Sequence, residues 1–447
     1  MQTKNIISTI VDFTSDGRSV AKTDSIVYFL EGGVIGDVVL INPTIQKKNY
    51  FEAEIVKTLK HSPQSVKSDC PYSERCGGCS LREYSYDAQV QTKARSVSEK
   101  IKRVTGLQDF TLDKIIPASE PNYYRNNVQL KCSWINGQLQ IGFFEKRSHK
   151  IVEIEKCMLL PPVMNTVIKT IKPFLEKLYS KNDTRKNFAL ESLSEIILRT
   201  NEDKNILMLI LVKKHFSKNI SLYKKILLDY ANANNIISIY EQNNLGKLNL
   251  IYGEKLLSLK VCDFVFQLSP NSFFQVNTKQ AELLFLEVLR QLKPTTNDVV
   301  YDLFCGVGSI SLIVANYVKK VYGIEIVSNA IKNAKANAIL NNINNATFVL
   351  GSVENVFTEK FLSQHNDENL KIILDPPRSG VSKKTLNLIC NSNIKKIIYV
   401  SCNPATLARD LKILYKNNFK IIESAIVDMF PYTTHVETVV LMSKFDV

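Results

Sequence analysis

The stretch DVVYDLFCGVG, residues 298–308, decides the fold of this chain. Asp298–Leu303 is rich in β-branched and aromatic residues, which is typical of a buried strand, and two glycines follow it before a stretch with helical spacing. A strand that runs through a glycine turn into a helix is the first unit of a doubly wound α/β sheet. Such a sheet binds its ligands beyond the carboxyl ends of its strands.

Strand and helix patterns alternate through the rest of the C-terminal part. An amphipathic helix is expected first, at Thr278–Leu292. Further strands are expected at Lys320–Ile326, Thr347–Ser352, Lys371–Asp375 and Lys396–Ser401, with a last one in VETVVLM. We therefore predict a parallel, doubly wound sheet for this part of the chain.

The N-terminal part has a different pattern, with short β-branched runs broken by Asp-Gly, Gly-Gly and Asn-Pro turns. These runs predict strands at Asn5–Phe13, Ser19–Lys22, Ile26–Leu30, Asp37–Asn42 and Tyr50–Leu59, and together a small β-barrel. A polar linker then leads to a cysteine-rich segment. Helical spacing follows at 89–105, and residues 120–265 mix strand patterns with helices near 162–180 and 217–234.

The composition is that of a globular protein with a polyanionic partner. Lys and Arg number 57 against 43 Asp and Glu, a net charge of +14, and residues 121–263 carry most of the excess, with 22 basic and 13 acidic side chains. The candidate phosphate-binding side chains of this segment are Arg125, Lys131, Lys146, Arg147 and Lys150. An ordinary solvated, lysine-rich face is the alternative.

Cellular location is inferred from the first residues and from the apolar runs. The start, MQTKNIISTIVDF, lacks the basic and apolar regions of a secretion signal, and no apolar run approaches the roughly 18 residues of a membrane helix. We therefore expect a cytoplasmic protein that does not enter a membrane. Its nine cysteines should then be reduced thiols, available for metal binding or catalysis.

Three of the cysteines form a C-x5-C-x2-C pattern, at Cys70, Cys76 and Cys79. Two glycines between the second and third allow the tight backbone that brings thiolates to one metal centre. The fourth ligand must come from elsewhere, and we choose Cys157 over Cys132 because it stands outside a strand and before a Pro pair. Zinc is the competing metal, and three ordinary thiols are the structural alternative.

The glycine turn after the first strand is a candidate nucleoside-cofactor site. Glu325 ends the next strand, where a carboxylate can accept both hydroxyls of a ribose. Because Ile310 and Ser311 stand where NAD-binding proteins need a third glycine, S-adenosylmethionine fits better than NAD. Asp375, followed by two prolines, should be fixed at the end of the fourth strand, over the same pocket.

Two further groups complete a reactive centre. Cys402 follows the fifth strand at the start of a helix, which should lower the thiol pKa and make it a nucleophile. Glu437 opens an apolar strand, where desolvation would raise its pKa toward that of a general base. His435 is more suited to structure or substrate contact than to metal binding. A thiolate, a base and a methyl donor together suit methylation of carbon 5 of uracil, because thiolate addition at carbon 6 makes carbon 5 nucleophilic.

At this point the sequence resembles the RNA 5-methyluridine methyltransferase family, and most of all its 23S ribosomal RNA uracil-C5 branch. The resemblance covers nearly the whole chain. It is carried by DCPYSERCGGC at 69–79, FFQVN at 273–277, DLFCGVG at 302–308, DPPR at 375–378, SCNPATLARD at 401–410 and HVE at 435–437.

The resemblance implies the fold and the roles of individual residues. It implies a Rossmann-like class I methyltransferase domain (89–118 and 266–447), an N-terminal OB-like TRAM β-barrel (1–60) and a central α+β domain with an iron–sulfur cluster (61–88 and 119–265). It also implies a [4Fe-4S] cluster on Cys70, Cys76, Cys79 and Cys157, an S-adenosylmethionine site at Gln275, Phe304, Glu325 and Asp375, the nucleophile Cys402 and the base Glu437.

The implied substrate is a uridine of 23S ribosomal RNA that leaves its stack to reach Cys402, with Phe273 or Phe274 stacking on it. The barrel carries seven basic and seven acidic residues, so aromatic contacts from Tyr28, Phe29 and Tyr50 would have to help it hold RNA. No obligate protein partner is implied, and we expect a monomer. The alternatives are a tRNA uracil-C5 methyltransferase and a non-catalytic RNA-binding or assembly protein. The last predicts loss of Asp375, Cys402 or Glu437, and all three are present.

Overall fold

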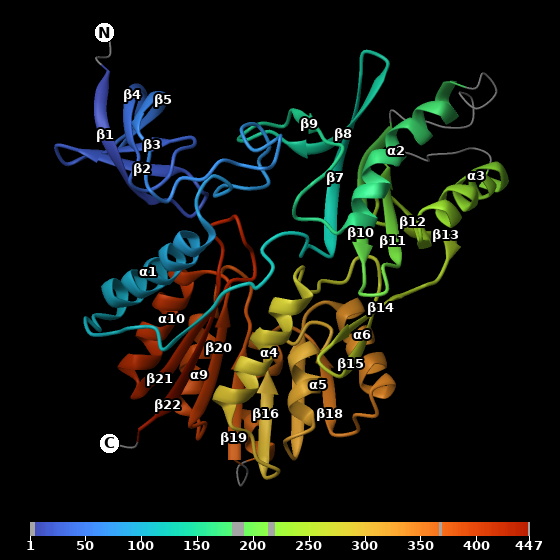
Figure 1. Cartoon of the computed structure of the whole chain (residues 1–447). Coiled ribbons are helices and arrows are strands. Elements are labelled where there is room, and N and C mark those ends of the chain that lie inside the picture. Colours follow the sequence, from blue (N-terminus) through green and yellow to red (C-terminus); the bar gives the residue numbers. More distant parts are fainter. Residues whose placement is uncertain (1–4, 181–191, 213–219, 366–368, 446–447) are drawn as a thin grey trace.

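The structure is a computed structural model that describes residues 5–180, 192–212, 220–365 and 369–445. Its strands form a small closed barrel, a seven-stranded sheet, a two-stranded hairpin and an eight-stranded sheet. Figure 1 shows the barrel at the N-terminal end of the chain, the seven-stranded sheet in the middle of the sequence and the eight-stranded sheet in the C-terminal part.

The predicted N-terminal barrel is confirmed. Its strands are β1 (Ile6–Phe13), β2 (Ser19–Thr23), β3 (Ile26–Leu30), β4 (Val38–Gln46) and β5 (Phe51–Lys60), paired in the closed order β1-β2-β3-β5-β4. The alternating pattern of β1 places Ile10 in the barrel core while its neighbours face outward. Tyr28 is only 3% exposed, so the expectation that its ring helps to hold RNA is wrong. Phe29 and Tyr50 are half-buried and contact each other at 4.4 Å between ring centroids.

The middle sheet has the strand order β13-β12-β11-β10-β7-β8-β9. Its strands are β7 (Asn127–Ile135), β8 (Gln138–Phe144), β9 (Ile151–Glu153), β10 (Leu193–Thr200), β11 (Ile206–Val212), β12 (Ile236–Asn243) and β13 (Leu248–Gly253). Helices α2 (Pro162–Ser180) and α3 (Ile220–Ala233) lie where helices were predicted, except that residues 217–219 are outside the described residues. Both faces of β11 are buried. The side chains of one face pack in the same core as α2, and those of the other face pack in a smaller apolar cluster.

The C-terminal sheet has the order β18-β17-β16-β19-β20-β22-β21-β6. Its strands are β16 (Asp298–Asp302), β17 (Lys320–Glu325), β18 (Ala346–Leu350), β19 (Asn369–Leu374), β20 (Lys396–Ser401), β21 (Phe419–Val427), β22 (Glu437–Lys444) and β6 (Lys114–Ile116). The hairpin that precedes it pairs β14 (Leu257–Val261) with β15 (Phe264–Leu268). Each strand predicted for this part is confirmed within two residues at either end.

The predicted parallel arrangement of the five strands from Asp298 to Ser401 is confirmed. The first five strands are parallel, but β22 pairs antiparallel with both β20 and β21. The physical reason is the connection from Val427 to Glu437, which is too short to hold the crossover helix that parallel neighbours need. The second residue of β22, Thr438, therefore pairs with Ser401, the last residue of β20.

Helices cover both faces of the C-terminal sheet. They are α4 (Thr278–Leu292), α5 (Ser309–Ala315), α6 (Ser328–Leu340), α7 (Val353–Val356), α8 (Glu359–Leu362), α9 (Lys383–Asn391) and α10 (Pro404–Lys416). Helix α1 (Tyr86–Thr105) comes from far earlier in the chain, yet Val97 and Ile101 share a core with Leu407 and Leu411 of α10. Figure 1 shows α1 beside α10 at the edge of this sheet.

No helix of the described ranges is long and apolar enough to span a bilayer.

Candidate active site

The carboxyl ends of four neighbouring strands bring the predicted site residues to one edge of the C-terminal sheet. Strand β16 ends at Asp302, β17 at Glu325, and Asp375 and Cys402 directly follow β19 and β20. Glu437 joins them because β22 runs antiparallel, with Thr438 paired to Ser401 at the end of β20. This is the edge at which doubly wound sheets bind their ligands.

The turn after β16 forms a cradle of backbone groups. Gly306 and Gly308 both have positive φ, of 54° and 85°, which a residue with a side chain rarely adopts. A Cβ on Gly308 would also lie 3.1 Å from the Phe348 ring. The Glu325 carboxylate accepts the N–H of Gly306 at 3.1 Å and the N–H of Val327 at 2.8 Å, so it is fixed against this turn.

Asp302 is the most buried acid of the cradle. Its Oδ2 accepts a hydrogen bond from Ser311 at 2.6 Å, while its buried Oδ1 has no hydrogen-bond partner among the described residues. Burial raises the pKa of Asp302 to about 6. A buried acceptor without a donor is costly, so this oxygen is suited to a donor group on a ligand. Phe304, half-buried, follows at the start of the turn.

A second segment, residues 272–277, contributes Gln275. The Gln275 side chain is 9% exposed, and its backbone carbonyl accepts a hydrogen bond from the Asn126 amide at 3.0 Å. The two aromatic residues before it differ sharply. Phe274 is 5% exposed and packs on Phe266, whereas Phe273 is 75% exposed. Only Phe273 can therefore meet a substrate without rearrangement of the core.

Cys402 lies between the end of β20 and the start of α10. Asn403 caps α10 through its side-chain oxygen and donates from its amide nitrogen to the backbone carbonyl of Arg378 at 2.9 Å. The prediction that the pKa of Cys402 is lowered is wrong. Burial, together with the charges of Glu437 and Asp375, outweighs the lowering effect of Arg378 and raises the pKa of Cys402 to about 11.

The two carboxyl groups beside Cys402 are also desolvated. Burial raises the pKa of Asp375 to about 7, with a smaller effect from Asp302. Glu437 is 4% exposed, and burial raises its pKa well above the usual range, with Asp375 adding to the effect and Arg378 opposing it. The predicted rise in the pKa of Glu437 is confirmed, and a carboxylate of high pKa is a strong proton acceptor once it is ionised.

Sequence reasoning missed the contact between Arg378 and His435. The Arg378 Nη2 atom lies 3.1 Å from both ring nitrogens of His435. Burial, with a further contribution from Arg378, lowers the pKa of His435 to about 4, so the imidazole is neutral at pH 7. The DPPR and HVE motifs hold both residues, but no sequence pattern indicates that they meet.

The four predicted cluster cysteines lie in one region of the molecule. The pKa of Cys79 is raised to about 12, mainly by burial. The charges of Cys157, Cys76 and Cys70 add to this rise. The pKa of Cys132, in contrast, is raised by burial and by Glu195. Within the described ranges, no group of three or more His, Cys, Asp or Glu side chains is arranged to hold a metal ion.

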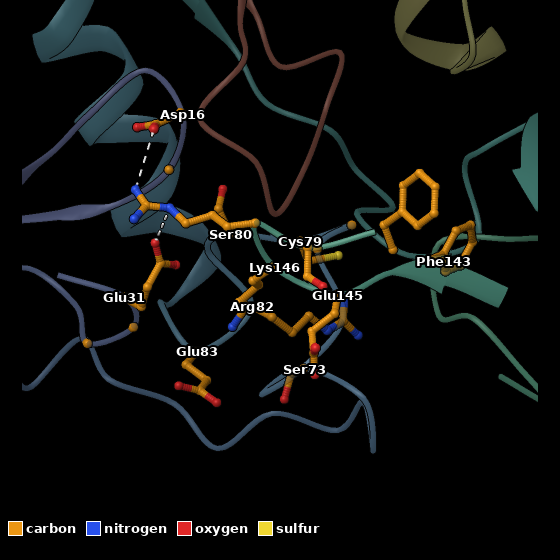
Figure 2. A pocket seen from close by; sticks show the side chains of 18 of the residues that line it. Asp16, Glu31, Ser73, Cys79, Ser80, Arg82, Glu83, Phe143, Glu145 and Lys146 are labelled. Atoms are coloured by element: carbon orange, nitrogen blue, oxygen red, sulfur yellow. Dashed lines mark ion pairs between the residues drawn. The ribbon is translucent and has the colours of Figure 1, made fainter. Parts of the chain in front are cut away.

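A cavity of about 590 Å³ lies away from Cys402, among the barrel, the cysteine segment and the loop after β8. Figure 2 shows Asp16 and Glu31 of the barrel on one side of it and Cys79, Arg82 and Glu145 on the other. Arg147 makes ion pairs with Glu31 at 2.6 Å and with Asp16 at 3.9 Å, which ties the barrel to this loop.

The basic side chains of the middle segment are partly engaged within the protein. Lys131 pairs with Glu195 at 2.6 Å, and Arg147 pairs with the barrel. Lys146 lines the cavity. Six basic residues of the segment lie outside the described residues, namely Lys181, Arg185, Lys186, Lys213, Lys214 and Lys218.

Comparisons with known proteins agree with the geometry of this site. A family model described as tRNA (uracil-5-)-methyltransferase matches residues 85–445. An uncharacterized RNA methyltransferase of Bacillus cereus (strain ATCC 10987 / NRS 248) is 35% identical, over 97% of this chain and 95% of that protein. One from Clostridium tetani (strain Massachusetts / E88) is 33% identical, over 98% and 95%.

The fold has a counterpart among solved structures. The crystal structure of Pyrococcus abyssi tRNA (uracil-54, C5)-methyltransferase in complex with S-adenosyl-L-homocysteine superposes with a TM-score of 0.74 at 23% identity, over 98% of this chain and 100% of that one. The shared fold is an α/β methyltransferase sheet with an N-terminal five-stranded barrel of TRAM type. From the family match and the two relatives, the chain belongs to the family of RNA uracil-C5 methyltransferases.

Proposed function

We propose that this protein transfers the methyl group of S-adenosylmethionine to carbon 5 of a uridine in 23S ribosomal RNA. Cys402 is the nucleophile and Glu437 the base. The observation that carries the proposal is their meeting at one sheet edge, where the pairing of β20 with β22 places the buried Glu437 beside Cys402. Methylation of an amine would need neither group.

The reaction follows from these two side chains. The Cys402 sulfur bonds to carbon 6 of the uracil, which turns the ring into an enolate that is nucleophilic at carbon 5. S-adenosylmethionine supplies an electrophilic methyl group and leaves as S-adenosylhomocysteine. Glu437 then takes the proton from carbon 5, the electron pair of that bond restores the carbon 5–carbon 6 double bond, and the sulfur leaves as a thiolate. The Arg378 charge lowers the pKa of Cys402, which favours the thiolate.

The residues of the cradle fit the methyl donor. The positive φ of Gly306 and Gly308 lets the backbone approach a ligand closely. The free Oδ1 of Asp302 can accept from an ammonium or hydroxyl group, and Glu325 stands where a ribose would be held. Gln275, Phe304 and Asp375 complete the proposed donor site.

The RNA side of the site rests on Phe273 and on the barrel. Because a uracil inside a helix cannot reach Cys402, the target nucleotide must turn out of its stack. The exposed ring of Phe273 is the surface on which that base can stack. We assign residues 1–60 to the barrel, 61–88 and 119–265 to the middle unit, and 89–118 and 266–447 to the methyltransferase unit, acting as a monomer.

We also propose a [4Fe-4S] cluster on Cys70, Cys76, Cys79 and Cys157. The donor set fits, since thiolates are the ligands of such clusters and the charges of the other three cysteines act on Cys79. Each thiolate of a cluster binds its own iron, so the four need not converge on a single ion. When bound, the cluster would tie the cysteine segment to the chain before α2.

Iron content tests this assignment. Protein purified without oxygen is expected to contain about four irons per chain and to absorb broadly in the visible range. Cys79→Ser should lose most of this iron, whereas Cys132→Ser, the matched control, should keep it, because Cys132 is apart from the other cysteines. The measurement is metal analysis by mass spectrometry, and one zinc per chain in place of iron would contradict the cluster.

Two alternatives differ in the substrate or in the chemistry. The matching family model and the Pyrococcus protein are both described with tRNA, which favours a tRNA uracil as the second candidate. The cysteine segment beside a TRAM-type barrel supports ribosomal RNA through its resemblance to the 23S branch. A non-catalytic assembly protein would have no need of a thiol and two buried carboxyl groups at one edge.

Mapping of methylated uridines distinguishes the two RNAs. Cells that lack this gene are expected to lose 5-methyluridine at one or more positions of 23S ribosomal RNA, and to regain it with the wild-type gene but not with Cys402→Ala. Mass spectrometry of nuclease fragments of ribosomal RNA and tRNA makes the measurement. Loss of the methyl group from tRNA alone would assign the protein to the tRNA alternative.

A further inference from the structure

The loop that leads into Glu437 is held by two segments from the other end of the chain. We define the base loop as residues 428–436, which connect β21 to β22. It closes between the paired residues Val427 and Glu437, so its shape sets where β22 and the proposed base begin. It also carries His435, which contacts Arg378.

The first of these segments is α1, which reaches the start of the base loop through buried charges. The Lys93 ammonium donates to Asp428 Oδ1 at 2.6 Å and to the carbonyl of Phe430 at 3.1 Å. Tyr86 donates from its hydroxyl to Asp428 Oδ2 at 2.8 Å. Lys93 and Asp428 are 3% and 1% exposed, so this ion pair is fully desolvated. A buried pair of this kind fixes one geometry, because either partner alone would be an uncompensated charge.

The second segment is the cysteine segment, residues 69–82, which reaches the middle of the loop at Tyr432. The carbonyl of Tyr432 accepts the N–H groups of Ser80 and Leu81, at 3.1 and 3.0 Å. The guanidinium of Arg82 lies 3.9 Å from the centre of the Tyr432 ring, a cation–π contact. Tyr432 has a φ of 65°, a left-handed conformation that a non-glycine residue keeps only when its surroundings hold it.

The C-terminal end of the cysteine segment therefore contacts Tyr432, and the N-terminal end supports this contact through Asp69. Arg82 is itself held by Asp69, whose Oδ1 accepts from Arg82 Nε at 3.1 Å. Asp69 directly precedes Cys70, and Ser80 directly follows Cys79. The segment that would bind the cluster thus contacts the base loop through backbone and side chain alike, at a residue five positions before Glu437, where β22 begins.

We propose that Arg82 and Tyr432 are positioning residues for the base, through which the cysteine segment sets the place of Glu437. This inference rests on the proposed roles of Cys402 and Glu437. The inference gives the cysteine segment a task in the proton-transfer step. Removal of the contact should slow departure of the proton from carbon 5 and leave the earlier steps unchanged.

Two variants separate the ring from the backbone. Tyr432→Asn removes the ring but tolerates the left-handed conformation, and Tyr432→Phe keeps both. Arg82→Gln removes the cation above the ring. Arg75→Gln is the matched control, because Arg75 belongs to the same segment but pairs with Glu145 of the loop after β8.

The test uses two RNA substrates and the intact protein. With uridine RNA, Tyr432→Asn and Arg82→Gln are expected to lower kcat about tenfold at an unchanged KM, and to accumulate a covalent protein–RNA adduct on a denaturing gel. With RNA that carries 5-fluorouridine at the target, no proton can leave carbon 5, so these variants should form the adduct at the wild-type rate. Tyr432→Phe and Arg75→Gln should behave as wild type, and the iron content of all variants should match.

Other results would contradict either the positioning role of Arg82 and Tyr432 or the proposed function. Equal loss of turnover on uridine RNA and of adduct formation on fluorouridine RNA would overturn the inference, as would a raised KM at unchanged kcat. If Arg82→Gln does not fold, the comparison of Tyr432→Asn with Tyr432→Phe decides alone. If the wild-type protein forms no adduct with fluorouridine RNA, the proposed function itself fails.

Discussion

Replacement of Cys402 by alanine is expected to lower methyl transfer by at least about 10⁴-fold, because the enolate at carbon 5 cannot form without a bond to carbon 6. The fold should survive, since the half-buried thiol has only a modest packing role and its loss leaves no unpaired charge. S-adenosylmethionine should bind as tightly as to the wild type, because the cradle after β16 is untouched. The measurement is transfer of a labelled methyl group to RNA, with donor affinity from calorimetry.

The control for this variant is Cys262→Ser, a half-exposed residue at the turn between β14 and β15. It should retain full activity. Methyl transfer by Cys402→Ala at the wild-type rate would exclude the nucleophilic mechanism. Loss of donor binding together with activity would instead indicate that the substitution disturbs the cradle, and the proposed role of Cys402 would lose its support.

The elements that the sequence predicted best are those whose signals are local. The strands from Asp298 to Ser401 were each visible as an apolar run with turn residues at its ends, and the rule that parallel strands meet at their carboxyl ends then brought Glu325, Asp375 and Cys402 together. The barrel was predictable for the same reason, because its strands are neighbours in sequence and alternate in polarity.

What could not be predicted depends on contacts between distant segments. The position of β22 between β20 and β21 follows from a short loop and from pairing, neither of which leaves a pattern within β22 itself. Lys93 and Asp428 are separated by 335 residues in the chain, and nothing near either one predicts a buried ion pair. The direction of the pKa shift of Cys402 was predicted wrongly. The sequence shows that Cys402 stands at the start of a helix, but it does not show that the thiol is buried beside Glu437.

These long-range contacts also change how the cysteine segment is understood. In the structure the middle sheet has an extensive core of its own, from Val128 to Ile239, while the cysteine segment contacts the base loop. A cluster that stiffens this segment would therefore act on the methyltransferase unit at its proton acceptor.

Replacement of Glu437 by glutamine should lower turnover by about 10²–10⁴-fold and trap the reaction after methyl transfer. Glutamine has nearly the shape of glutamate but cannot accept a proton, so the carbon 5 proton stays in place and Cys402 cannot leave. The methylated RNA should remain bound to the protein, visible as a slow band on a denaturing gel. Because Glu437 is buried and its pKa lies well above the usual range, a neutral amide should be tolerated there at little cost to folding.

The matched control is Glu354→Gln, at the start of α7, which should turn over normally and leave no adduct. The double variant Cys402→Ala with Glu437→Gln should form no adduct at all, which assigns the covalent bond to Cys402. If Glu437→Gln releases product at the wild-type rate, another group removes the proton. In that case Asp375, whose pKa of about 7 suits a base at neutral pH and which lies at the same sheet edge, would take the role.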